Sequence, residues 1–155
     1  MNRTFARAAL TALMIAALAL AGCGTAAEAE HPTDGVWGYV TSADSAQLEI
    51  ATTQPGGDEI VVDRVLAPDA AWLVVHLNDD GKPGMRVGLA HVDAGETRDV
   101  RVVLDEVTGD SVIVAVHADK AEEDSFDFDM DAPTTSPDRP YFVEGVELAA
   151  VVTIR

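Results

Sequence analysis

The residues of this chain best suited to chemistry are the carboxylates of one acidic stretch. Asp119, Asp127, Asp129 and Asp131 belong to it, and carboxylate oxygens are the ligands that Ca²⁺ prefers. Three of them alternate along the chain, so on an extended backbone they would share one face. An EF-hand loop needs glycine at its sixth position and glutamate at its twelfth. Counts from Asp119 and from Asp127 supply neither, so these aspartates are candidate metal ligands without a standard motif.

A second interpretation of the acidic stretch is a solvated loop. Charge runs are common on surfaces, and Phe126 and Phe128 would pin such a loop to the core. Loops on a rigid scaffold are also where binding residues concentrate. Glu122, Glu123 and Asp124 are therefore the candidate interaction surface.

Histidines are the other candidate ligands. His76 and His117 each end an apolar segment, and His91 follows another. Imidazole suits Zn²⁺ and copper, but the spacing is not diagnostic, and a site would require the rings to converge in space. The alternative is that His76 and His117 form hydrogen bonds at strand ends. A copper–thiolate site would need a cysteine beside two histidines, and Cys23 is the sole cysteine.

Catalytic motifs are not found in the sequence. There is no Gly-x-Ser-x-Gly nucleophile motif, and Gly81-Lys82-Pro83-Gly84 lacks the order of a phosphate-binding loop. Carboxylate pairs are frequent in so acidic a chain, so their presence alone does not indicate a glycosidase. We expect a protein that is not an enzyme.

An apolar leader precedes Cys23. Arg3 and Arg7 form a short basic region, and Ala8 to Ala21 is almost entirely apolar. This run is shorter than the ~20 apolar residues that span a bilayer, which favours a signal peptide. Leu20-Ala21-Gly22-Cys23 resembles the lipobox of bacterial lipoproteins.

The lipobox resemblance implies cleavage before Cys23, acylation of its thiol by palmitate-type chains, and anchoring in a membrane. We expect a signal peptide over residues 1–22, a flexible tether over 23–35, and a location at the cell membrane or outer membrane, on the extracytoplasmic side. The alternative is an ordinary secretory signal. Two or three acyl chains anchor a protein stably, whereas one binds marginally.

Charge limits the partners. The chain carries 10 basic and 27 acidic residues, a net charge of −17. Two of the basic residues and none of the acidic ones precede Cys23, so residues 23–155 hold 8 basic and 27 acidic residues, a charge of −19. Such a chain repels nucleic acid and anionic headgroups. The lipid on Cys23 would therefore be its contact with the membrane.

The elements that must position these residues are strands. Val100, Val102 and Leu104 alternate with polar residues, which predicts a half-buried strand. Residues 71–75 and 112–116 are apolar on both faces and predict central strands. Turn signals such as Asp79-Asp80-Gly81 separate the segments. We predict an all-β domain over 36–155, a single antiparallel β-sandwich of immunoglobulin-like type, with a cupredoxin-like sandwich as second choice. Trp72 would plug its core.

Several short motifs occur in order along the folded part of the chain. They are Val61 to Asp69, Trp72-Leu73-Val74-Val75-His76, Gly88, Ala94-Gly95, Val100-Arg101-Val102, His117-Ala118-Asp119, Asp127-Phe128 and Asp138-Arg139-Pro140-Tyr141. Together they resemble an extracellular β-sandwich domain of unknown function, found in haloarchaeal surface proteins and some bacterial secreted proteins. The resemblance covers roughly Gln47 to Ile154 and implies a sandwich fold at a surface, with no catalytic or metal residues to carry over.

Two functional hypotheses follow from the sequence. The first is a non-catalytic, lipid-anchored envelope protein that acts as an extracytoplasmic binding or interaction module without a cofactor, and whose partner is an envelope protein or a small ligand. The second is an extracytoplasmic protein that binds Ca²⁺ or a transition metal.

Overall fold

The computed structural model describes residues 37–121 and 125–155. The predicted signal peptide, Cys23 and tether lie outside these residues, as do Glu122, Glu123 and Asp124. Within the described ranges no helix is long and apolar enough to cross a membrane. The strands are β1 (Tyr39–Thr41), β2 (Gln47–Glu49), β3 (Thr53–Gln54), β4 (Glu59–Ala67), β5 (Ala71–Asp79), β6 (Lys82–Val92), β7 (Gly95–Val103), β8 (Ser111–Ala118), β9 (Tyr141–Val143), β10 (Val146–Glu147) and β11 (Ala149–Ile154).

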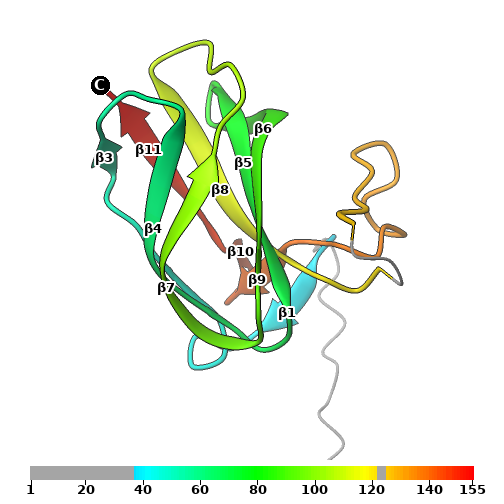
Figure 1. Ribbon diagram of the computed structural model, residues 1–155. Coiled ribbons are helices and arrows are strands. Elements are labelled where there is room, and N and C mark those ends of the chain that lie inside the picture. The colour runs from blue at the N-terminus through cyan, green and yellow to red at the C-terminus, as the bar shows by residue number, and fades with distance from the viewer. Residues whose placement is uncertain (1–36, 122–124) are drawn as a thin grey trace, which may run out of the picture. The chain divides into compact units, whose positions relative to one another are not determined.

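The strands form three sheets (Figure 1). The largest has the order β3-β11-β8-β5-β6, the second is β2-β4-β7, and a small third is β1-β9-β10. Neighbouring strands are antiparallel except in two short pairs, β1 with β9 and β3 with β11, which are parallel. The predicted all-β fold is confirmed and the architecture is consistent with a β-sandwich. Its immunoglobulin-like subtype stays a prediction.

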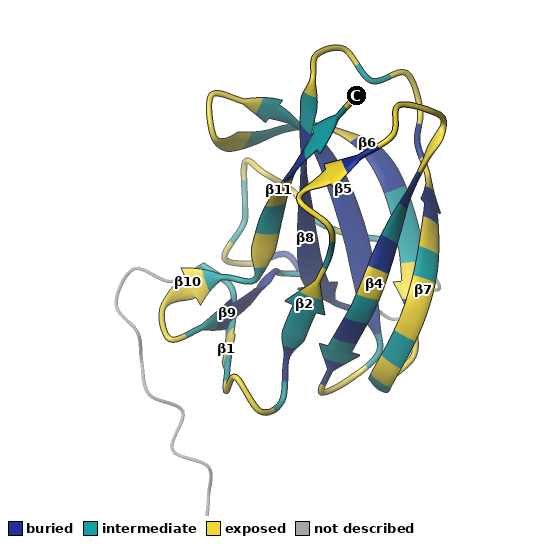
Figure 2. Ribbon diagram, turned by 90° about the vertical axis from the view of Figure 1, so that its left-hand side faces the viewer, coloured by how far each residue is buried: buried dark blue, intermediate teal, exposed yellow. Residues whose placement is uncertain are grey.

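One hydrophobic core lies between the five-stranded sheet and β2-β4-β7. Alternation along β4 turns Ile60 and Val62 inward, and along β7 it does the same for Val102. Val114 of β8 and Leu73 of β5 meet them from the opposite sheet. Figure 2 shows how burial differs between the sheets. Strands β5 and β8 are buried over most of their length, whereas β7 alternates between exposed and partly buried residues. Burial of these aliphatic side chains is the main force that holds the sheets together.

The central strands are buried on both faces, as their sequences predict. Leu73 and Val75 join the core, whereas Trp72, Val74 and His76 point to the outer face of the five-stranded sheet and are also buried. The connection between β8 and β9 covers this outer face (Figure 1, orange). We call its described residues, 119–121 and 125–140, the cap. The expectation for Trp72 needs correction, because this side chain is buried beneath the cap and not in the core between the sheets.

Two tight hairpins use residues suited to left-handed backbone. Asp79 pairs with Lys82, which leaves Asp80 and Gly81 as a two-residue loop with φ values of 49° and 85°. Positive φ at both central residues is the requirement of a type I′ turn, which matches the twist of the flanking strands. The predicted turn is therefore present, and Glu144-Gly145 repeats it between β9 and β10.

Replacing Gly81 tests the turn. Gly81→Ala should destabilise the domain by about 1–2 kcal/mol, because a Cβ is strained in the left-handed region although nothing lies within 4 Å of it. Gly57 has equally open surroundings and no positive φ. Gly57→Ala should therefore leave stability unchanged or raise it by up to about 1 kcal/mol. Urea denaturation of the wild type and of the two variants measures the change in the free energy of unfolding. Equal changes at Gly81 and Gly57 would contradict the argument.

Candidate functional site

The candidate site lies on the outer face of the five-stranded sheet, beneath the cap. Strand alternation brings Trp72 and His76 of β5 to this face, and cross-strand pairing places His117 of β8 and His91 of β6 on either side of Trp72. Phe126 of the cap packs over the same face, with its ring centre 5.3 Å from that of His117. Three strands and one long connection therefore build the site together.

The structure brings His76 and His117 together, and we call them the histidine pair. Their ring centres are 6.5 Å apart and their planes are tilted by 36°. Their backbones are not adjacent, since His76 pairs with Ile113 and His117 pairs with Trp72. The two side chains therefore lean toward each other over the outer face of β5 and β8.

Hydrogen bonds fix the chemical form of each imidazole. Nδ1 of His76 lies 2.9 Å from the carbonyl oxygen of Gly84, and Nδ1 of His117 lies 2.8 Å from that of Asp138. A carbonyl oxygen only accepts, so Nδ1 must carry the proton and donate it. In the neutral ring, Nε2 then keeps its lone pair.

Burial keeps both rings neutral. It lowers the pKa of His117 to about 4, even though the hydrogen bond to Asp138 acts in the opposite direction. Burial also lowers the pKa of His76, and the nearby positive charge of Arg86 adds to this effect. The site at neutral pH therefore presents two uncharged imidazoles with unprotonated Nε2 atoms.

Aromatic rings pack against His117, one member of the histidine pair. Phe128 approaches His117 edge to face at 4.9 Å, and Arg86 lies over the ring of Phe126 at 5.3 Å. Trp72 is only 8% exposed, and its Nε1 donor has no hydrogen-bond partner among the residues that the structure describes. The surroundings are therefore largely apolar, with one unused donor.

Asp138 holds the cap against the sheet. Its side chain is fully buried. One carboxylate oxygen accepts from the backbone amides of Lys120 and Ala121, at 2.7 and 2.9 Å, and the other accepts from that of Asp127 at 2.7 Å. Its carbonyl oxygen also accepts from His117. Asp138 therefore links both ends of the cap to the histidine pair.

The four candidate aspartates do not meet as a set. The Asp119 carboxylate accepts a hydrogen bond from Nε2 of His91 at 2.9 Å, and that of Asp129 accepts from the amide of Asp131. Asp127, Asp129 and Asp131 are exposed. Over residues 37–121 and 125–155, no three histidine, cysteine or carboxylate side chains group closely enough to hold a metal ion.

The chain was compared with the profiles of known protein families. The profile of a domain of unknown function, DUF7282, matches residues 46–154. The chain belongs to the DUF7282 family. The match covers every residue of the site described above, and it confirms a domain of unknown function over nearly the range expected, Gln47 to Ile154. No curated protein matches the chain significantly, and no solved structure does so either.

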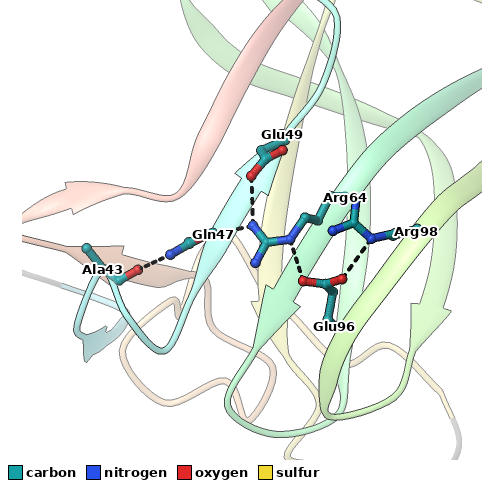
Figure 3. Close-up of polar contacts among 6 residues, drawn as sticks. All are labelled: Ala43, Gln47, Glu49, Arg64, Glu96 and Arg98. Carbon is teal, nitrogen blue, oxygen red and sulfur yellow. Dashed lines mark hydrogen bonds and ion pairs between the residues drawn. The ribbon is translucent and has the colours of Figure 1, made fainter.

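The DUF7282 domain carries a polar network on the outer face of the three-stranded sheet β2-β4-β7 (Figure 3). The Arg64 guanidinium of β4 binds Glu49 of β2 at 2.7 Å, Glu96 of β7 at 2.6 Å and Gln47 at 2.6 Å. Glu96 also binds Arg98 at 2.7 Å. Hydrogen bonding to Arg64 lowers the pKa of Glu96, and the reciprocal bond raises the pKa of Arg64. The network joins three strands, but its exposure limits its contribution to stability.

Sequence reasoning missed two of these features of the DUF7282 domain. Asp138 stands in one of the motifs of the resemblance, but nothing in its neighbours shows that this aspartate is buried. Arg64 and Glu96 are 32 residues apart and meet only because β4 pairs with β7 in a defined register. The histidines, by contrast, were visible as candidates, and only their convergence needed the fold.

Proposed function

We propose that this chain is a non-catalytic, lipid-anchored envelope protein whose DUF7282 domain acts as an extracytoplasmic interaction module. The observation that carries the proposal is the way the cap presents its charges. Phe126 and Phe128 pack toward the sheet, while Asp127, Asp129 and Asp131 remain exposed. The cap is held against the sheet by its aromatic side chains and exposes its carboxylates to solvent, which makes it a surface suited to binding.

Electrostatics selects the kind of partner. With a charge of −19 on residues 23–155, the domain repels nucleic acid and anionic lipid surfaces and attracts a basic partner. The predicted contact surface of Glu122, Glu123 and Asp124 belongs to the same connection. We therefore propose a positively charged protein segment or small ligand as the occupant of this surface.

The anchor supports a location at the membrane. The sequence Leu20-Ala21-Gly22-Cys23 after an apolar leader favours acylation of Cys23. The acyl chains would hold the acidic domain at a membrane whose headgroups repel it. The resemblance to haloarchaeal surface domains and bacterial secreted domains fits the same extracytoplasmic location.

Replacing Cys23 tests the anchor. Cells that express the wild-type chain with a radioactive or alkyne-labelled palmitate should incorporate the label, and the protein should fractionate with membranes. Cys23→Ala should abolish labelling, because the thiol that carries the acyl chains is removed. Labelling that persists in Cys23→Ala would contradict acylation at this residue.

The interaction surface is tested by neutralising its carboxylates. The triple variant Asp127→Asn, Asp129→Asn, Asp131→Asn keeps side-chain shape and removes three negative charges. Its crosslinking to envelope partners in intact cells should fall, and wild-type crosslinking should weaken with added salt. A matched control neutralises Asp44, Asp58 and Asp93, which are exposed elsewhere. Equal crosslinking by the two triple variants would overturn the proposal for this surface.

A further inference from the structure

We propose that His76 and His117 form a two-ligand site for a soft monovalent metal ion, Cu⁺ or Ag⁺, on the outer face of the five-stranded sheet. The site lies beneath the cap, against Phe126 and Phe128. This inference goes beyond the interaction role and stands or falls independently of it.

The hydrogen bonds of the histidine pair are those of metal-binding imidazoles. Histidines that ligate a metal usually donate their second ring N–H to a carbonyl or carboxylate, which fixes the tautomer and orients the ring. Gly84 and Asp138 accept these protons from Nδ1 of His76 and His117. With the proton on Nδ1, the lone pair of each neutral ring is on Nε2, the atom that would bind the ion.

The separation of the rings suits one bridging ion. Ring bonds of about 1.3 Å place a ring nitrogen about 1.1 Å from its ring centre, and a metal–imidazole bond is about 2.0 Å. An ion held in a line between two imidazoles therefore sets the ring centres about 6 Å apart. The observed 6.5 Å is close to this distance, so the spacing of the two rings leaves room for one ion between them.

The charges around the pair favour a monovalent ion over a divalent one. The guanidinium of Arg86 lies on the same face, with its strand position paired to that of His76. The Asp138 carboxylate already accepts three amide protons and offers no free anionic ligand. The cost of burying an uncompensated charge rises steeply with the size of the charge. Two neutral ligands therefore suit an ion with one positive charge better than an ion with two positive charges.

The number of ligands points the same way. Zn²⁺ sites are almost always four-coordinate with at least three protein ligands, whereas Cu⁺ and Ag⁺ accept two ligands in a line. No third metal-ligating side chain joins the histidine pair within the described residues. The rings of Phe126 and Phe128 pack against His117 at 5.3 and 4.9 Å and make its surroundings apolar.

Silver is the direct probe, because Ag⁺ has the coordination preference of Cu⁺ and does not change oxidation state. The full chain with Cys23→Ser removes the only thiol and serves as the reference protein. Calorimetry with AgNO₃ should show one ion per chain at this site. Nuclear magnetic resonance of ¹⁵N-labelled histidine should show a shift of Nε2 in two of the four imidazoles, assigned to His76 and His117, without any further substitution.

Variants then test the ligands. His76→Gln and His117→Gln keep a donor for the carbonyl and remove the imidazole Nε2 that would bind the ion. Each should weaken Ag⁺ binding by more than about tenfold, a loss seen when even the partner of a ligand is removed, while Asp44→Asn, at an exposed residue outside the site, should bind as the reference does. Binding that survives the double variant, Nε2 shifts at other histidines, or Zn²⁺ binding in preference to Ag⁺ would each overturn the proposal. The resonance measurement decides the question even if a variant fails to fold.

Discussion

Lowering the pH from 6.5 to 4 should destabilise the folded domain by about 3 kcal/mol through His117 alone. Its pKa falls from 6.5 to about 4 on folding, chiefly because of burial, and each pKa unit corresponds to about 1.4 kcal/mol. Between these two values the unfolded chain binds a proton that the folded chain does not. The stabilisation is therefore complete above pH 6.5, declines as the pH falls, and is lost at about pH 4.

The comparison of wild type with His117→Gln isolates this effect from the many carboxylates that titrate in the same range. Glutamine can still donate to the carbonyl of Asp138, but it does not titrate. Urea denaturation at a series of pH values should give a slope of stability against pH that is steeper in the wild type, by up to about 1.4 kcal/mol per pH unit.

A direct titration of the folded protein provides a second measurement. The ¹⁵N resonances of His117 should report a neutral ring down to about pH 4. His76 should also titrate below its usual range, because burial and the charge of Arg86 lower its pKa. A His117 ring that takes up its proton near pH 6.5 while the domain stays folded would show that the ring is not buried as described.

The strands could be predicted from the sequence because burial on one or two faces leaves a direct pattern. Val112 to Val116 is apolar at every position, and β8 is buried on both sides. Val100 and Val102 alternate with charged residues, and β7 is buried on one face only. The turn at Asp80-Gly81 was equally clear, since it depends on local backbone preference.

The arrangement of the site could be predicted only in part. Phe126 and Phe128 were recognisable as anchors of an acidic connection, and they do pack over His117. The direction in which Trp72 faces was not recognisable, because both faces of β5 are buried and the alternation gives no sign of which is the core. A single sequence also carries no register between β5 and β8, on which the approach of His76 to His117 depends.

Asp138→Ala should be the most damaging substitution in the cap, with an expected loss of about 3 kcal/mol or more. Hydrogen bonds to a charged group contribute about 1.5–3 kcal/mol each, and buried donors left without a partner add a desolvation cost. The amides of Lys120, Ala121 and Asp127 would all lose their acceptor. Asp138→Asn should have a smaller effect, because its amide oxygen can still accept from one side while its nitrogen cannot accept at all.

Hydrogen exchange can separate loss of the cap from loss of the fold. If Asp138 acts as described, Asp138→Ala should first remove protection at the amides of Lys120, Ala121 and Asp127, while the amides of β5 and β8 stay protected until global unfolding. Asp131→Ala is the matched control, because its side chain is exposed in the same segment and its loss should change stability by no more than about 0.5 kcal/mol. Similar losses in the two variants would mean that the cap is held by Phe126 and Phe128 alone. Retained protection at the three amides would mean that the Asp138 carboxylate is not their acceptor in solution.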